Sequence, residues 1–253
     1  MATDTRPEII RADGVTKRFG KLVAVDNVSY LLRENEVAGI IGSNGAGKTT
    51  FFNLLSGLLP PSEGRMWFRD REITTLRAYQ RARLGIARSF QITNIFGRLS
   101  VYENVRLAVQ AVHDGKASFF VPRGSMGNLA EKTERVLHDV GLYDVRDARA
   151  ENLSHGDQRR LEIGLVIASD PPVLLLDEPL AGMSPTETQE TVDLIQRISP
   201  GRTILLVEHD IDVVMAISTT ITVFQTGAVL AIGTPQEIRG NEAVQRAYLG
   251  ELA

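Results

Sequence analysis

A glycine-rich segment near the start of the chain limits the fold more than any other feature of the sequence. Residues 42–50 read GSNGAGKTT and match the pattern G-x-x-x-x-G-K-[ST]. The apolar run 37–41 precedes the segment, and residues 47–56 have the composition of a helix that stops at Gly57. A strand, a glycine-rich loop and a helix in this order predict an α/β fold with a phosphate-binding loop, or P-loop.

The residue types in this loop suit a triphosphate. Glycines let successive backbone N–H groups turn towards one anion, and the helix N-terminus adds the positive end of its dipole. Lys48 supplies a point charge, and the Thr49 hydroxyl can ligate Mg²⁺. A chance glycine-rich turn is the alternative, which random chains of this length contain in roughly 1% of cases. The residues expected to bind the triphosphate are Ser43, Asn44, Gly45, Ala46, Gly47, Lys48, Thr49 and Thr50.

A second candidate site follows the apolar run 173–176, where two carboxylates, Asp177 and Glu178, stand side by side. Asp177, nearest the strand, is suited to hold magnesium, whereas Glu178 can orient or deprotonate an attacking water. The alternative is an acidic turn without a catalytic role. The apolar run 204–207 predicts another buried strand, and polar groups that follow parallel strands meet at one edge of a sheet.

Composition excludes several function classes. The formal charge of −3 and a pI near 5.9 argue against nucleic acid as a partner. The absence of cysteine excludes disulfides, thiolate metal sites and cysteine catalysis. No run of apolar residues reaches the length of a membrane span, and residues 1–14 lack the apolar core of a signal peptide. We therefore expect a cytoplasmic protein.

The order of apolar runs and amphipathic stretches predicts one domain with an insertion. The expected catalytic core comprises residues 1–91 and 159–233, the helical insertion residues 92–158, and the C-terminal helical tail residues 234–253. Thr226-Gly227 predicts a hairpin turn. The further elements expected are helices over 101–109, 129–140, 235–239 and 242–248, and hairpin strands over 222–224 and 228–232.

With these two sites placed, the chain resembles the ATP-binding subunits of ABC transporters over nearly its whole length. The resemblance implies a P-loop ATPase core with a parallel-sheet catalytic subdomain, an antiparallel β element and an inserted helical subdomain. It also implies ATP and Mg²⁺ as ligands. Ser89-Phe90-Gln91 resembles the family's Q-loop, whose glutamine, here Gln91, reaches magnesium and the nucleophilic water.

Three further segments carry the resemblance. Residues 153–160, LSHGDQRR, are similar to the signature LSGGQ, which implies that the segment Ser154, His155, Gly156 and Asp157 binds the γ-phosphate held by a partner subunit. Val207-Glu208-His209-Asp210 resembles the H-loop, in which His209 contacts that phosphate and stabilises the transition state. Arg18-Phe19-Gly20 resembles the aromatic A-loop, which implies that Phe19 stacks on adenine.

The chain departs from the family pattern at three of these positions. His155 replaces the first of two signature glycines, and Asp157 stands where glutamine is common, so an extra negative charge is expected near phosphate. Ser184 of Ala181-Gly182-Met183-Ser184 occupies the D-loop position where the family usually has aspartate. A regulatory module that binds ATP without hydrolysing it therefore stays an alternative, although Lys48, Glu178 and His209 are retained.

Within the family, the chain is most similar to the branched-chain amino-acid importer ATPases of the LivG type. The resemblance rests on the insertion around 112–128, bulky residue 155, and the ending AYLGE at 247–251. It implies a second ABC ATPase subunit, identical or not, two transmembrane permeases, indirectly an extracytoplasmic solute-binding protein, and a peripheral position on the inner face of the membrane. The alternatives are a lipopolysaccharide exporter, a urea or amide importer, and a soluble ABC ATPase of translation or DNA repair.

Overall fold

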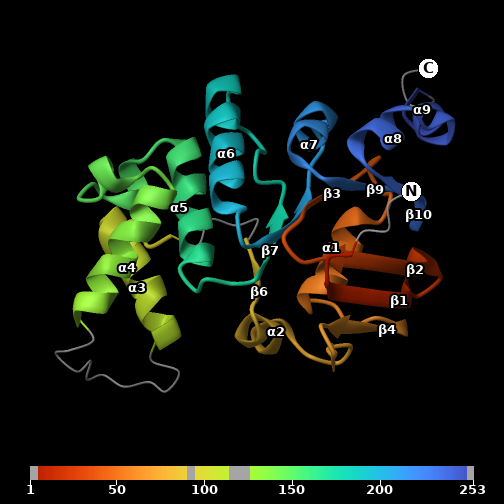
Figure 1. The fold of residues 1–253 in the computed structure, drawn as a ribbon, viewed down its shortest axis with the longest axis horizontal. Helices are drawn as coiled ribbons and strands as arrows, with labels where there is room; N and C mark the ends of the chain where they lie inside the picture. Colours follow the sequence, from red (N-terminus) through yellow and green to blue (C-terminus); the bar gives the residue numbers. More distant parts are fainter. Residues whose placement is uncertain (1–4, 90–94, 114–125, 250–253) are drawn as a thin grey trace.

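The computed structural model describes residues 5–89, 95–113 and 126–249, and its larger sheet has six strands in the order β10-β9-β3-β8-β7-β6 (Figure 1). Strands β9, β3, β8, β7 and β6 run parallel, and β10 pairs antiparallel with β9 at one edge. The bounds are β3 Val37–Gly42, β6 Ile86–Arg88, β7 Val173–Asp177, β8 Thr203–Val207, β9 Thr220–Gln225 and β10 Ala228–Gly233.

This sheet separates two hydrophobic cores. Because successive side chains of a strand point to opposite faces, Val173 and Leu175 of β7 join one core, whereas Leu174 and Leu176 join the other. All four side chains are fully buried. A strand buried on both faces reads as a continuous apolar run, which is the pattern that made β7 and β8 visible in the sequence.

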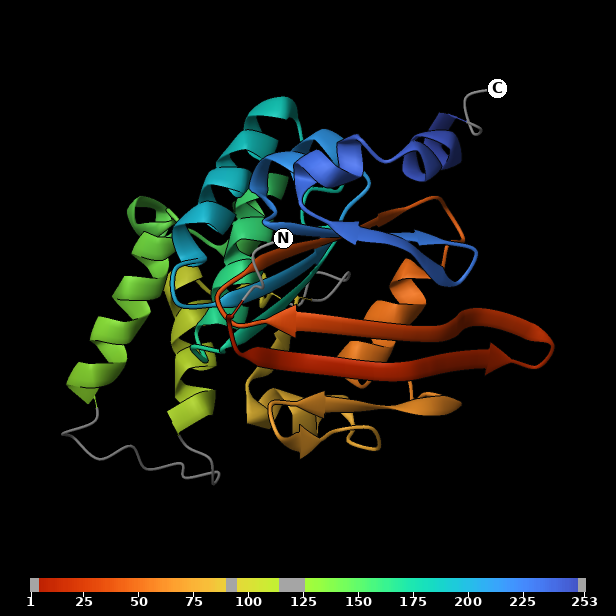
Figure 2. The ribbon, with the colours of Figure 1, turned by 45° about the vertical axis from the view of Figure 1, so that its right-hand side comes forward.

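A smaller antiparallel sheet faces the first core, with strand order β2-β1-β4-β5. Figure 2 shows its long hairpin of β1 (Glu8–Phe19) and β2 (Leu22–Arg33). Helix α1 (Lys48–Ser56) contributes to the core between the two sheets, where the Phe51 ring lies 5.4 Å from Tyr30 of β2 and 5.2 Å from Phe224 of β9. The helix that follows the P-loop is thus packed from both sides. The remaining strands are β4 (Glu63–Phe68) and β5 (Arg71–Glu72).

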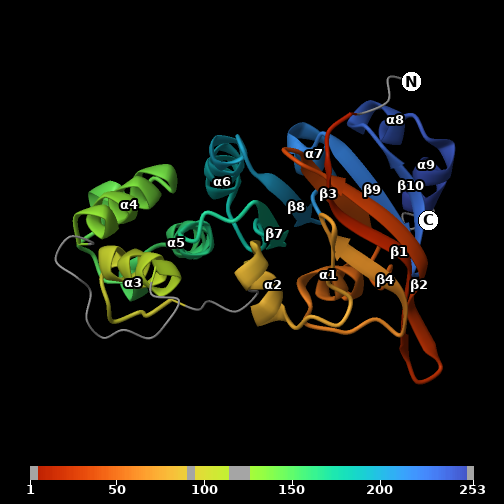
Figure 3. The same ribbon diagram turned by 60° about the horizontal axis from the view of Figure 1, so that its bottom comes forward.

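Helices cover the other face of the larger sheet and extend beyond its edge. Figure 3 shows α3, α4 and α5 grouped at one end of the molecule, away from the small sheet, with α6 and α7 against the parallel strands. The helix bounds are α2 Ala78–Leu84, α3 Val101–His113, α4 Met126–Asp139, α5 His155–Ile167, α6 Pro185–Ile198, α7 Ile211–Ile217, α8 Pro235–Arg239 and α9 Glu242–Leu249. Two short 3₁₀ helices, η2 (Tyr143–Val145) and η3 (Ala150–Asn152), lead to α5.

The α/β class with a parallel sheet, an antiparallel element and helices beyond the sheet edge is confirmed. Each strand and helix predicted above is present with small changes at its ends. Sequence reasoning did not place β1, β2, β4, β5, β6, α2, α6 or α7. The limits of the helical insertion remain predictions, since residues 90–94 lie outside the described part of the chain. Among the described helices, none is both long and apolar enough to cross a membrane.

Candidate active site

The P-loop connects β3 to α1 through backbone that requires glycine. Gly47 has φ 96°, and a Cβ atom there would lie 2.4 Å from the Ala24 carbonyl oxygen. A Cβ on Gly42 would lie 2.4 Å from the carbonyl oxygen of Phe224. Gly47 is also the N-cap of α1, where it offers no side chain to the first amides of the helix. The loop is therefore held closely against β2 and β9, with the start of α1 left to an external anion.

The Lys48 ammonium lies folded over this loop. The side chain is 5% exposed, and its Nζ donates hydrogen bonds to the carbonyl oxygens of Gly42 at 2.6 Å and Ser43 at 2.9 Å. A bound phosphate would present further acceptors to the same ammonium group. The main chain of the loop itself thus holds Lys48 in place.

A cleft of 430 Å³ lies in front of the loop. Residues 44–50 line it together with residues 22–24 of β2, and Glu178 and His209 stand in its wall. Phe19 is not among the described residues that line it: this side chain ends β1, is 46% exposed and packs 5.3 Å below the Lys17 ammonium. Adenine stacking on Phe19 remains a prediction.

The Asp177 carboxylate is completely buried at the end of β7, where Arg88 of the neighbouring strand holds one of its oxygens. Arg88 of β6 donates from Nη2 to Asp177 Oδ2 at 2.5 Å and from Nη1 to Asn53 Oδ1 and Ser56 Oγ of α1 at 2.6 and 2.8 Å. Within the described residues, Asp177 Oδ1 has no hydrogen-bond partner. A buried, unpaired carboxylate oxygen is costly unless something binds it, so this oxygen fits a cation ligand.

Glu178 occupies a strained turn directly after β7. Its φ is 45°, a left-handed conformation that costs about 1–3 kcal/mol for a non-glycine residue. Its N–H donates to the Val207 carbonyl oxygen at 2.9 Å, and its Oε1 lies 3.0 Å from His209 Nε2. The turn therefore brings the carboxylate to the histidine that follows β8.

Glu208 supports this pair from behind. The side chain is 4% exposed, and it accepts hydrogen bonds from the N–H groups of Leu180 at 2.7 Å and His209 at 3.1 Å. Burial raises the pKa of Glu208 above its ordinary value. The two turns that present Glu178 and His209 are thus joined through one buried carboxyl group.

The first turn of α5 contacts the first turn of α6. Ser154 caps α5 by accepting from the Asp157 N–H at 3.1 Å, while the Gly156 N–H donates to Glu187 Oε1 at 3.0 Å. Glu187 also closes a capping box with Ser184 at the start of α6. Hydrogen bonds from Ser184, and then from Gly156, lower the pKa of Glu187. The Gly156 amide, in the segment expected to bind phosphate, therefore donates its hydrogen bond to the Glu187 carboxylate of the same chain.

The unusual aspartate of the signature segment is balanced by an arginine one turn along α5. Arg160 Nη2 forms an ion pair with Asp157 Oδ1, and the same nitrogen lies 3.3 Å from Glu190 Oε2 of α6. The extra negative charge predicted at position 157 is therefore partly compensated inside the chain. The start of α5 is not among the described residues lining the cleft in front of the P-loop.

The structure thus brings Glu178 and His209 to the cleft that the P-loop lines, and it joins Asp177 to α1 through Arg88. Ser154–Asp157 are not among the described residues lining that cleft, although His155 lines a neighbouring pocket with Asp177 and Glu178. Gln91 lies outside the described residues. Sequence reasoning missed the supporting roles of Arg88, Glu187 and Glu208. Ser184-Pro185-Thr186-Glu187 carries a readable capping-box pattern. Single charged residues beside apolar runs, such as Arg88 after Ile86-Ala87, also mark buried ion pairs.

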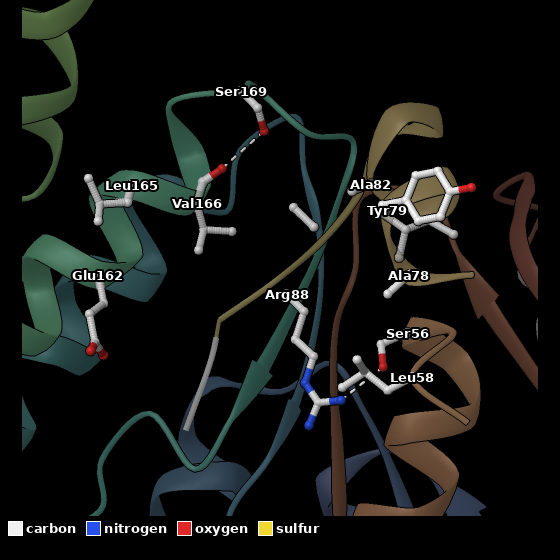
Figure 4. A pocket seen from close by; sticks show the side chains of 12 residues that line it. Ser56, Leu58, Ala78, Tyr79, Ala82, Arg88, Glu162, Leu165, Val166 and Ser169 are labelled. Carbon is white, nitrogen blue, oxygen red and sulfur yellow. Dashed lines mark hydrogen bonds between the residues drawn. The ribbon is translucent and has the colours of Figure 1, made fainter. Parts of the chain in front are cut away.

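An apolar groove of 510 Å³ opens between α2, β6 and α5 (Figure 4). Leu58 and Tyr79, which are 50% and 58% exposed, line one side, and Leu165 and Val166 of α5 line the other. The figure shows Arg88 between the two sides, bonded to Ser56. The groove thus reaches the arginine that holds Asp177.

Comparison with known proteins identifies the family of this chain. A family model described as ABC transporter matches residues 25–181, and one described as branched-chain amino acid ATP-binding cassette transporter matches residues 228–253. The chain therefore belongs to the ABC transporter family, whose ATP-binding cassettes are ATPases.

Individual relatives cover almost the whole chain. LivG of Salmonella typhimurium, a high-affinity branched-chain amino acid transport ATP-binding protein, is 42% identical over 96% of this chain and 98% of its own length. BraF of Pseudomonas aeruginosa, with the same description, is 40% identical over 98% and 99%, whereas the lipopolysaccharide export protein LptB of Acidithiobacillus ferridurans is 32% identical over 96% and 98%. The ATP-binding cassette MJ1267 in its ADP conformation superposes with a TM-score of 0.83, 27% identity and coverage of 96% and 99%.

Proposed function

We propose that this chain is the ATP-hydrolysing subunit of a membrane importer for branched-chain or related amino acids. The observation that carries the hydrolytic part is the Glu178–His209 pair, 3.0 Å apart in the wall of the cleft that the P-loop lines. The cargo is supported by the similarity to LivG and BraF and by the matching C-terminal segment.

The described residues support an in-line attack of water on the γ-phosphate of ATP. The amides of residues 43–50 and the Lys48 ammonium would bind the triphosphate at the start of α1. Glu178 would accept a proton from water or orient it, and His209 would donate to the transferred phosphate oxygens as charge develops. Gln91 completes this set as the residue expected to contact the water.

The residues present fit Mg²⁺ as well. Asp177 Oδ1 is buried and unpartnered within the described chain, while Arg88 holds the other oxygen of the carboxylate. Thr49, the second residue of α1, would add its hydroxyl, and Gln91 is the third proposed contributor. When bound, the ion would neutralise the negative charge that develops on the β- and γ-phosphate oxygens during hydrolysis.

Two cassettes would be needed to complete each site. In one chain the start of α5 lies outside the cleft, which supports its binding to ATP held by a second cassette, identical or not. The Ser154 hydroxyl, the Gly156 amide and the neighbouring His155 and Asp157 would then meet the γ-phosphate. Because Glu187 accepts from the Gly156 amide in the free chain, phosphate would replace a carboxylate there.

The remaining partners would be membrane proteins. The exposed apolar groove between α2 and α5 is suited to receive a helix from one permease, and the second cassette would bind the other permease. The permeases would collect solute from an extracytoplasmic binding protein. We therefore propose a peripheral position for the cassette on the cytoplasmic face of the membrane. Arg88 lines the groove and also holds Asp177, so a helix bound in the groove would lie next to a residue that contacts the active site.

The hydrolytic role is tested with Glu178→Gln. We expect this variant to bind ATP as the wild type does, to lose turnover, and to accumulate an ATP-bound dimer that gel filtration detects. Hydrolysis at the wild-type rate would contradict the role of Glu178. The isosteric change Gln189→Glu, at an exposed position of α6, serves as a surface control.

The cargo is tested in cells that lack the gene for this chain. Uptake of radiolabelled leucine should fall and should return with the wild-type chain but not with Glu178→Gln. Restored export of lipopolysaccharide or uptake of urea or amides, with leucine uptake unchanged, would assign the cassette to another transporter. Recovery of the tagged chain without any permease would favour an ATPase that is not coupled to transport.

A further inference from the structure

Arg159, in the second turn of α5, contacts the main chain of the catalytic turn. Its Nη2 donates to the carbonyl oxygens of Asp177 at 2.8 Å and Glu178 at 3.2 Å, and its Nε donates to that of Pro179 at 3.4 Å. The side chain is 12% exposed. One guanidinium group therefore spans the three residues that carry both active-site carboxylates.

A second buried residue of α5 orients this guanidinium. Glu162, 8% exposed, accepts from Arg159 Nη1 through Oε2 at 2.7 Å, and within the described residues its Oε1 has no hydrogen-bond partner. Because the guanidinium is planar and delocalised, fixing one nitrogen with a carboxylate fixes the directions of the others. The ion pair thus aims the remaining donors at the turn.

The turn needs such support because Glu178 adopts a φ of 45°. Strained backbone persists where its surroundings hold it in place, and Arg159 supplies two donors on the carbonyl side of this strained unit. The amide side is held by the Val207 carbonyl oxygen at 2.9 Å. The side chain of Glu178 therefore leaves a peptide segment that is fixed from both ends.

We infer that Arg159 is a positioning residue for ATP hydrolysis, which directs the Glu178 carboxylate through the main chain of residues 177–179. Its guanidinium lines a 340 Å³ pocket with His155, Glu162, Asp177 and Glu178. Glu178 also lines the nucleotide cleft, whereas Arg159 is not among the described residues that do. The inference rests on the proposed catalytic role of Glu178. It assigns to Arg159 an effect on turnover without an effect on ATP binding.

The test compares Arg159→Met, which keeps the stem and removes the donors, with Arg159→Lys and with the control Arg135→Met on the exposed face of α4, where Arg135 is 67% exposed. We expect Arg159→Met to lower kcat about 10- to 100-fold, because small displacements of a catalytic group cost rates of this order. The KM for ATP should change by less than about twofold, since no contact to the P-loop is lost.

Two further measurements separate positioning from general stability. Arg159→Lys should recover part of kcat, because an ammonium can reach one or two of the carbonyl oxygens. Free guanidinium at millimolar concentration should partly restore Arg159→Ala, whose missing side chain adjoins the 340 Å³ pocket, whereas tetramethylammonium should not. In the Glu178→Gln background, Arg159→Met should form the ATP-bound dimer as readily as the single variant.

Wild-type kcat in Arg159→Met would overturn the inference, and so would a rise in KM or a loss of the trapped dimer equal to the loss in kcat. If Arg159→Met does not fold, wild-type kcat in Arg159→Lys together with no guanidinium rescue of Arg159→Ala would also overturn it. Full activity of Glu178→Gln alone would instead reject the proposed function. The two failures are therefore distinguishable.

Discussion

The ion pair between Arg88 and Asp177 predicts the largest single effect on stability near the active site. Asp177 is fully buried and Arg88 is 10% exposed, so replacing the arginine with methionine leaves a buried carboxylate without its cation. Removing one partner of a buried pair costs about 3–5 kcal/mol. The Arg88 guanidinium also lies 4.8 Å from the ring centre of Phe52, a contact that contributes up to about 1 kcal/mol.

Arg88→Met should therefore destabilise the nucleotide-free chain by about 4 kcal/mol. At about 2–4 °C per kcal/mol for a chain of this size, the melting temperature should fall by about 8–16 °C. The measurement is urea-induced unfolding followed by circular dichroism, with thermal unfolding as a second probe.

A double-mutant cycle identifies the cause. Asp177→Asn removes the negative charge that Arg88 neutralises. The double variant Arg88→Met/Asp177→Asn should therefore lose about 2 kcal/mol less free energy of unfolding than the two single variants lose together. Strictly additive losses would refute the ion pair as the source of the effect. Arg135→Met, which removes an exposed arginine, should change stability by less than about 0.5 kcal/mol.

Three further outcomes follow from the geometry. Arg160→Gln should weaken ATP-dependent dimer formation of the Glu178→Gln chain about tenfold, because the negative charge of Asp157 is then no longer neutralised by Arg160. Adding Asp157→Gln should restore dimer formation, which sedimentation measures. Glu187→Gln should lower the urea midpoint near neutral pH. Because the folded-state pKa of Glu187 is lowered, this difference should shrink as the pH falls through that pKa in urea titrations. Arg81→Met should lower the free energy of unfolding by about 3–5 kcal/mol in the same assay, because the fully buried guanidinium donates to five main-chain carbonyl oxygens. Burial lowers the pKa of Arg81 to about 10, so the side chain stays charged near neutral pH and the loss should not vary there.

The features that sequence reasoning found are those that local chemistry dictates. The strand before the P-loop, β7 and β8 are visible because strands buried on both faces must be apolar throughout, and the loop itself needs glycines at fixed places. Asp177 and Glu178 are visible because two carboxylates directly follow such a strand. These signals lie within a few consecutive residues.

The supporting residues were missed because their partners lie far away in the chain. Arg88 and Asp177 are 89 positions apart, and Gly156 and Glu187 are 31 apart. The long β1–β2 hairpin was also missed, since its register contains several irregularities that disturb simple alternation of polar and apolar residues. Pairing over such distances depends on the packing of the sheet, which no local pattern encodes.

The first turn of α1 lacks a side chain that caps its backbone amides. Helices α5, α6, α7 and α8 each begin with a Ser, Asp or Thr whose side chain caps a backbone amide, whereas α1 begins with Gly47 and has no side-chain cap. In the proposed function, the nucleotide's phosphates would act as the missing N-cap. Slower hydrogen exchange in the first turn of α1 should therefore report how much of the cassette is loaded, independently of any turnover.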